Sequence, residues 1–376
     1  MANATGREIA LDEETLDDFL ADPRFSRTFE LPADEAQGRN QRVVVSYADY
    51  GYRNQANPKL ENVFLFFAPL LGSRMTRVAL DKLAQEHKVR IIDPDRPGFG
   101  KTTDAEPQAR IAFWTDAVMA LLKHLDIPHV SIGTQSGGTV YALDLVLHHP
   151  EILHPERPYV GIGAPWIHPS QSGSLAMSIT QSLPKALIAQ TGKLASLVAT
   201  VSAPMVSTSF GISDFLIGLV GAESPAEQAA ASEADRQVLF EDALQPRMIK
   251  FVYRESVHGL SQDAIVLMKR IESGSGWSDW GDYDTLVPRL ADVLRCRGQR
   301  LVVEVFLGET DFMVGDAGSK GPEWFNQCWK AVSDADDSPI DYSCTVVKGS
   351  DHNTTWNLRW GIPERVFRRL GETAAQ

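Results

Sequence analysis

A serine stands between small residues where a predicted strand passes into a predicted helix. The segment 133–138 reads Gly-Thr-Gln-Ser-Gly-Gly, and helical spacing begins near Thr139. On such a tight turn the hydroxyl of Ser136 is held away from the backbone. The amide of Gly137, at the amino end of the helix, is placed to stabilise negative charge on an oxygen atom. A phosphate loop would need a Lys followed by Ser or Thr, which is missing, so we expect a nucleophilic serine.

A serine hydroxyl becomes a good nucleophile when a base removes its proton and a carboxylate fixes the tautomer of that base. His352 follows a predicted strand at 342–347, and Asp311 follows a predicted strand at 301–307. Parallel strands present their carboxyl ends at one edge of a sheet. We therefore expect His352 as general base and Asp311 as the acid that orients it, both close to Ser136. The chain order Ser, Asp, His differs from the orders of chymotrypsin and subtilisin.

Short apolar runs alternate with segments of helical spacing, and this pattern predicts a mostly parallel sheet flanked by helices. Before the alternation, residues 24–32 and 42–50 predict an antiparallel strand pair. The predicted buried strands are 62–67, 89–93, 130–133, 159–163, 301–307 and 342–347, and the predicted helices are 77–86, 109–125, 139–148, 322–332 and 363–370.

The alternation stops near Pro165, and the following hundred or so residues are helical in character. We expect an α/β core formed by residues 1–165 and 283–376, with residues 1–40 as leader and first strand. A helical cap is expected at 166–282. Its nearly uncharged runs at 175–179, 194–201 and 215–220 form either a small helical core or the roof of a largely apolar pocket.

The composition is that of an ordinary globular protein, with 43% hydrophobic and 23% charged residues among 376. The formal charge of −13 argues against a general affinity for nucleic acid or anionic membranes. We expect a small-molecule substrate, a cytoplasmic location and no membrane span, because the first 30 residues are acidic and the least charged stretch contains Pro204. No motif predicts a metal or a cofactor. A homo-oligomer is left open.

From about Arg42 to the C-terminus, the chain resembles the α/β-hydrolase superfamily with a cap. Residues 95–100, which read Asp-Arg-Pro-Gly-Phe-Gly, resemble the loop after the fourth strand of that family. Residues 136–143 resemble its nucleophile elbow and the helix that follows, and 308–311 and 351–352 resemble the segments that carry the acid and the histidine. The sequence as a whole also resembles fungal members of the superfamily that are often found in natural-product pathways. The resemblance implies an oxyanion hole formed by the amides of Leu70 and Gly137.

Three features depart from the family pattern. Thr134 stands where the family prefers Gly, and its β-branch adds bulk that is expected to reshape the elbow slightly. Ala68 and Pro69 replace a His-Gly pair before Leu70, but a preceding proline leaves the Leu70 amide intact. Asp351 replaces a glycine before the histidine, where it either stabilises the imidazolium or faces solvent.

The resemblance implies a serine hydrolase that cleaves an ester, thioester or lactone. The nearly uncharged segments between Ser170 and Val220, and Phe99 beside the expected oxyanion loop, predict that the substrate is a bulky, mostly apolar small molecule. We assign Phe99, Gln135 and His258 to its substrate pocket. Epoxide hydrolases and dehalogenases of this family use an Asp at the elbow, and Ser136 counts against them. Two alternatives stay open: a non-hydrolytic cyclase or isomerase of a natural-product pathway, and a ligand-binding receptor on the same fold.

Overall fold

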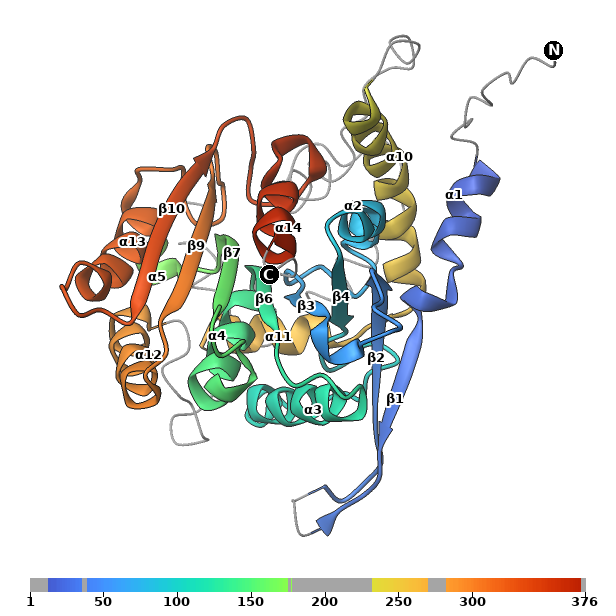
Figure 1. The fold of residues 1–376 in the computed structure, drawn as a ribbon, viewed down its shortest axis with the longest axis horizontal. Coiled ribbons are helices and arrows are strands. Elements are labelled where there is room, and N and C mark those ends of the chain that lie inside the picture. Colours follow the sequence, from blue (N-terminus) through green and yellow to red (C-terminus); the bar gives the residue numbers. More distant parts are fainter. Residues whose placement is uncertain (1–12, 36–38, 175–176, 178–231, 270–281, 373–376) are drawn as a thin grey trace.

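An eight-stranded sheet forms the centre of the molecule, with strand order β1-β2-β4-β3-β6-β7-β9-β10 (Figure 1). The computed structural model describes residues 13–35, 39–174, 177, 232–269 and 282–372. β1 (Arg27–Leu31) pairs antiparallel with β2 (Val43–Gly51), and β2 pairs antiparallel with β4. The remaining neighbours in the sheet are parallel. The structure confirms the predicted antiparallel pair and the mostly parallel sheet.

The other predicted strands and all five predicted helices are present, and their ends lie within four residues of the predicted ends. The strands are β3 (Asn62–Phe67), β4 (Val89–Pro94), β6 (Ser131–Ser136), β7 (Tyr159–Pro165), β9 (Leu301–Gly308) and β10 (Ile340–Val347). The helices are α2 (Asp81–Glu86), α3 (Arg110–His124), α4 (Gly138–His148), α13 (Lys320–Ser333) and α14 (Ile362–Glu372). The sequence analysis did not identify α1 (Glu13–Leu20) or α12 (Tyr283–Arg297).

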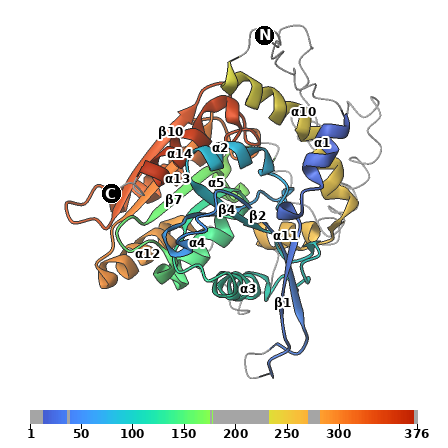
Figure 2. The same ribbon diagram turned by 45° about the vertical axis from the view of Figure 1, so that its right-hand side comes forward.

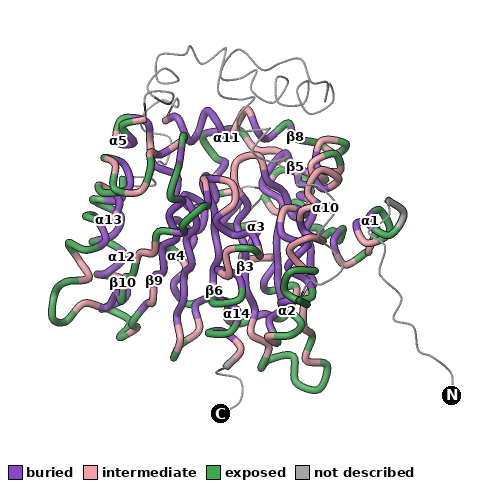
Figure 3. Tube along the Cα trace, turned by 90° about the horizontal axis from the view of Figure 1, so that it is seen from above, coloured by how far each residue is buried: buried purple, intermediate pink, exposed green. Residues whose placement is uncertain are grey.

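Alternating side chains of the strands build a separate apolar core on each face of the sheet. On β3, Leu65 and Phe67 pack with α3, α4, α12 and α13, whereas Phe64 and Phe66 pack with α2 and α14. Helices consequently lie on both sides of the sheet (Figure 2), and the inner strands are buried along most of their length (Figure 3), whereas most residues of the edge strands β1 and β10 are partly or fully exposed. This two-sided burial is why the strands appear in the sequence as continuous apolar runs.

The described part of the predicted cap consists of α5 (Pro169–Ser172), α10 (Glu233–Arg254), β8 (Ser256–Val257) and α11 (Gly259–Leu267). β8 pairs with the short β5 (Phe99–Gly100) of the core. The cap boundaries at 166 and 282 stay a prediction. The apolar runs at 194–201 and 215–220 lie outside the described residues, as does 175–179 apart from Met177. None of the described helices is long and apolar enough to cross a membrane.

Candidate active site

Ser136 occupies a sharp turn between β6 and α4. Its φ is +51°, in the left-handed region that residues with a side chain rarely adopt, and the pairing of β6 with β7 shifts register between Gln135 and Ser136. Such a conformation costs on the order of 1–3 kcal/mol and persists when the surrounding structure determines it. The strained turn sends the chain directly from the strand into the helix, as expected for a nucleophile elbow.

Close packing of α4 against the end of β3 holds this turn in place. A Cβ atom on Gly138 would lie 2.3 Å from the carbonyl oxygen of Phe67 and 2.7 Å from that of Ala68, so only glycine fits. The Thr134 side chain is fully buried, and its hydroxyl donates to the Phe67 carbonyl at 3.4 Å. The same Cβ atom on Gly138 would lie 2.8 Å from Oγ1 of Thr134, so the Thr134 side chain is accommodated beside a residue that has none.

Ser136, His352 and Asp311 form one chain of hydrogen bonds. Oγ of Ser136 donates to Nε2 of His352 at 2.7 Å, and Nδ1 of His352 donates to Oδ2 of Asp311, also at 2.7 Å. Each residue is at most 3% exposed. The three residues follow β6, β10 and β9, which are near one another in the sheet order. In this arrangement the neutral imidazole is in the tautomer that can take a proton from the serine.

The backbone that follows Asp311 fixes its carboxylate. Oδ1 accepts hydrogen bonds from the amides of Met313 and Val314, each at 2.9 Å, while Oδ2 is bonded to His352. The ring of Phe312 lies edge-on to the imidazole, with 6.3 Å between the ring centroids. The Asp311 carboxylate is thus held in one orientation.

Asp351 stabilises the turn that carries His352. Its Oδ1 accepts hydrogen bonds from the amides of Asn353 and Thr354, at 2.9 and 3.0 Å, and from the Thr354 hydroxyl. This is the local side chain to backbone bonding that aspartate favours in turns. The sequence left open whether Asp351 stabilises the imidazolium or faces solvent. The structure shows a third possibility, in which the Asp351 side chain bonds to the backbone of the loop that carries His352.

The amides of Leu70 and Gly137 lie next to each other beside the elbow. A Cβ atom on Gly137 would be 3.6 Å from the Leu70 nitrogen. Neither amide donates to any group within the described ranges of the chain. Two adjacent, unbonded amides, of which that of Gly137 stands at the start of α4, are suited to stabilise an oxyanion.

Arg96, from the loop after β4, holds the backbone around Leu70. Its guanidinium donates to the carbonyls of Ala68, Pro69 and Leu70 at 2.5, 2.8 and 2.9 Å. Its Nε also donates to Asp263 of α11 at 2.7 Å. Because three consecutive carbonyls are tied to one buried cation, the loop keeps a defined shape although Ala68 and Pro69 replace the pair typical of the family.

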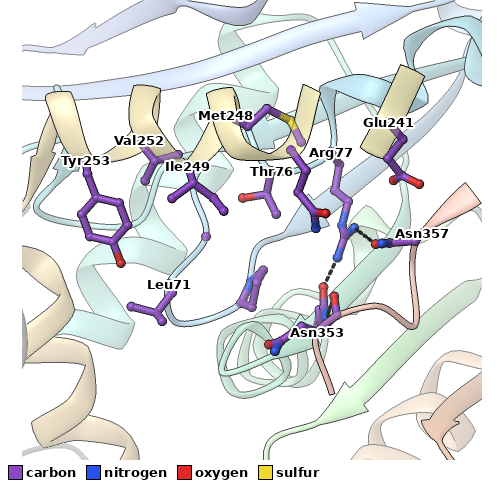
Figure 4. Close-up of a pocket in the computed structure, with 14 residues that line it drawn as sticks. Leu71, Thr76, Arg77, Glu241, Met248, Ile249, Val252, Tyr253, Asn353 and Asn357 are labelled. Carbon is purple, nitrogen blue, oxygen red and sulfur yellow. Dashed lines mark hydrogen bonds between the residues drawn. The ribbon is translucent and has the colours of Figure 1, made fainter. Parts of the chain in front are cut away.

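A pocket lies beside the elbow, between α10 and the loop that follows β3 (Figure 4). Met248, Ile249 and Val252 line it from α10, and Leu71 lies opposite. The other end is polar, with Arg77, Glu241, Asn353 and Asn357 among the lining residues. An apolar wall with a few polar groups at one end is typical of small-molecule sites.

Burial changes the ionisation of two charged groups at this polar end. It raises the pKa of the Glu241 carboxyl to about 7, although the nearby Arg77 and a hydrogen bond from the Leu358 amide oppose the rise. Burial also lowers the pKa of the Arg77 guanidinium, and the attraction of Glu241 opposes that change. Desolvation is the dominant cause in both cases, because each side chain is removed from water.

Gln135 lies in the lining of this pocket, but its side-chain amide is already bonded to the protein. Nε2 donates to the carbonyls of His352 and Asn353 at 2.9 and 3.0 Å, and Oε1 accepts a hydrogen bond from Arg77. These bonds use both N–H groups of the amide. A substrate therefore finds no free donor on Gln135.

Phe99 and His258, the other residues predicted to line a substrate pocket, lie outside the pocket beside the elbow. Phe99 is 1% exposed, and its ring centroid is 4.8 Å from the Arg96 guanidinium carbon, a cation–π contact. The side chain of His258 is 73% exposed, and its Nδ1 bonds to Asp104 at 2.7 Å. Neither side chain lines the pocket beside the elbow, and their assignment to a substrate pocket stays a prediction.

The sequence analysis missed the polar residues that support the site, namely Arg77, Glu241 and Asp263. Their partners are far away in the chain; for example, Arg77 and Asn357 are 280 residues apart. A local pattern cannot reveal such pairs. For Arg96 a signal existed, since it belongs to the recognised segment 95–100, but its bonds to the Leu70 loop were not anticipated.

No protein-family model matches this chain, and no curated protein matches it in sequence. Solved structures match it in three dimensions. A protein named as a lipase from Acinetobacter baumannii gives a TM-score of 0.55 at 12% identity, covering 100% of both chains. A thermophilic esterase from Thermogutta terrifontis gives 0.51 at 16% identity, covering 93% of this chain and 98% of the other. The enol-lactonase from Burkholderia xenovorans gives 0.51 at 12% identity, covering 86% and 95%.

At identities this low, similarity of structure establishes the fold, and the reaction has to be argued from the residues of the site. The sheet order, the strained serine turn and these structural neighbours agree with the resemblance noted in the sequence. The chain has the α/β-hydrolase fold.

Proposed function

We propose that the protein is a serine hydrolase that cleaves an ester, thioester or lactone through an acyl-enzyme on Ser136. The observation that carries the proposal is the continuous hydrogen-bonded chain from Ser136 through His352 to Asp311. The unbonded amides of Leu70 and Gly137 beside it add a place for the oxyanion. A nucleophile, a base, an orienting acid and an oxyanion site are the four groups that acyl transfer requires.

In the proposed reaction, Oγ of Ser136 forms a bond to the carbonyl carbon while Nε2 of His352 takes the hydroxyl proton. The carbonyl electrons move onto the oxygen, which the amides of Leu70 and Gly137 stabilise. When they return, the bond to the leaving group breaks, and the imidazolium gives its proton to that group. A water molecule then repeats the two steps and releases the acid, which restores Ser136. The Asp311 carboxylate stabilises the imidazolium that forms in each step.

The proposed substrate is a bulky, mostly apolar small molecule. Apolar side chains near the elbow support this class, since Leu70 and Met313 pack against a cluster that contains Val140, Trp166 and Leu267. Phe312, which contacts the imidazole of His352, is 37% exposed and offers an apolar ring to a ligand. An apolar surface around a polar reaction centre binds substrate through the hydrophobic effect while the polar groups orient the carbonyl.

Replacing Ser136 with Ala tests the proposal on a p-nitrophenyl ester of a medium-chain acid. We expect kcat to fall by several orders of magnitude, because no covalent intermediate can form. Ser131→Ala, on the same strand, is the matched control and should keep the wild-type kcat. An alanine variant at position 136 that keeps kcat within about tenfold, the scale of one lost neutral hydrogen bond, would refute the covalent role and favour the non-hydrolytic alternatives.

A further inference from the structure

Gln135 links the turn that carries Ser136 to the loop that carries His352. It precedes Ser136 directly in the chain, and its side chain is 1% exposed. Nε2 donates to the carbonyl of His352 at 2.9 Å and to that of Asn353 at 3.0 Å. One buried amide therefore bonds to the backbone of the general base while its own backbone is continuous with the nucleophile.

Arg77 determines which end of this amide faces the histidine loop. Its Nη2 donates to Oε1 of Gln135, and its Nη1 donates to Oδ1 of Asn357 at 3.2 Å. Because a guanidinium only donates, the oxygen of Gln135 must point toward Arg77 and the NH2 group toward the two carbonyls. Figure 4 shows Arg77 reaching from the loop after β3 toward Asn357.

The rest of the histidine loop is attached further along the chain. Nε1 of Trp356 donates to the carbonyl of Thr134 at 3.0 Å, and the amide of Leu358 donates to Glu241 at 2.8 Å. These contacts lie four and six residues beyond His352. Within the described residues, β6, α10 and Arg77 all contact this loop, but only Gln135 of β6 bonds to the backbone of His352 itself.

We propose that Gln135 is a positioning residue, oriented by Arg77, that sets the distance between Ser136 Oγ and His352 Nε2. The inference rests on the proposed function, since the distance matters for proton transfer in the acyl-transfer reaction. Proton transfer needs the two atoms within about 2.6–3.2 Å, and a misplacement of about 1 Å can cost roughly 100-fold in rate. Without the Gln135 amide, the carbonyls of His352 and Asn353 lose this donor and the histidine backbone loses its link to the elbow.

Two nearly isosteric substitutions separate positioning from packing. Gln135→Met keeps the volume of the side chain and removes all three hydrogen bonds. Gln135→Glu keeps an oxygen for Arg77, and makes that contact an ion pair, but turns a second oxygen toward the carbonyls of His352 and Asn353. The matched control is Ile132→Ala, a fully buried position on the same strand whose loss affects packing alone.

With a p-nitrophenyl ester as substrate, we expect kcat of both Gln135 variants to fall roughly 10- to 100-fold with KM nearly unchanged. Ile132→Ala should lower Tm but keep kcat at temperatures below its transition. The inference is overturned if the kcat of both variants stays at the level of Ile132→Ala, or if only KM changes.

Hydrogen exchange of the peptide that spans residues 348–358 gives a readout that needs no substrate. Exchange in this peptide should be faster in Gln135→Met than in the wild type, and near the wild-type rate in Ile132→Ala. Equal rates in Gln135→Met and the wild type would overturn the inference. A wild-type protein that hydrolyses no ester would refute the proposed function, and the exchange rates would still decide whether Gln135 holds the loop.

Discussion

The site depends on hydrogen bonds that each fix the orientation of one side chain. Asp311 is the clearest case, because both carboxylate oxygens are used: Oδ1 by the amides of Met313 and Val314, and Oδ2 by His352. An acid that accepts at both ends leaves the imidazole one orientation and one tautomer. The proposed base is therefore arranged for proton transfer in the absence of substrate.

Replacing Asp311 with Asn tests this arrangement at a single atom. The amide oxygen can still accept from Met313 and Val314, so the fold should be retained. The NH2 group then faces Nδ1 of His352, which must become an acceptor, and the ring proton moves to Nε2, where it can no longer take the serine proton. We expect kcat for ester hydrolysis to fall by about 10⁴-fold with little change in KM. A KM effect with unchanged kcat would contradict the assigned role.

At the scale of elements, two features decide where the reacting groups meet. The sheet brings the ends of β6, β9 and β10 to one edge, and the close approach of α4 to β3 at Gly138 bends the chain sharply at Ser136. Helix α10 also contacts the site, because Glu241 accepts a hydrogen bond from the amide of Leu358, in the loop that follows His352. That contact places a nearly buried carboxyl between a helix and the core, at a cost that depends on pH.

The stability of the protein should therefore depend on the ionisation of Glu241. Burial raises its pKa to about 7 from an ordinary value of about 4.5, and Arg77 only partly offsets the rise. Between these two pH values the folded protein keeps a proton that the unfolded chain has released. The free energy of unfolding consequently falls as the pH rises through this window, by about 3 kcal/mol in all.

Glu241→Gln should remove this dependence, since the amide oxygen still accepts from Leu358. We expect the free energy of unfolding in urea, compared at pH 5 and pH 8, to fall about 3 kcal/mol less in the variant than in the wild type. Glu106→Gln, which replaces an exposed carboxyl, is the control and should behave as the wild type does. An equal fall with pH in Glu241→Gln and the wild type would show that Glu241 is not the group responsible.

At the scale of the whole molecule, much of the core could be predicted because its strands are buried on both faces. β3 is a run of apolar residues that begins and ends where the sequence predicts. Helix α12 was missed although Leu286, Leu290 and Leu294 recur at helical spacing, because Pro288 interrupts the pattern. Local periodicity thus reports elements that bury a regular face, and it becomes ambiguous where a helix-breaking residue intervenes.

The residues of the candidate site could likewise be predicted only in part. Ser136, Asp311 and His352 could be predicted to lie together because each stands at or after the carboxyl end of a strand. Parallel strands present these ends at the same edge of the sheet. The bonds of Gln135 to the histidine loop join residues more than 200 positions apart, and no local signal marks them. The contacts of Phe99 with Arg96 and of His258 with Asp104 are tertiary and could not be predicted from the sequence either.

Covalent labelling of the purified protein with a fluorophosphonate, followed by intact mass and peptide mass spectrometry, shows whether Ser136 is a nucleophile. We expect one added phosphonyl group per chain, located on Ser136, with labelling abolished in Ser136→Ala and strongly slowed in Asp311→Asn. An unlabelled wild-type protein, or a label on another residue that persists in Ser136→Ala, would contradict the covalent role of Ser136.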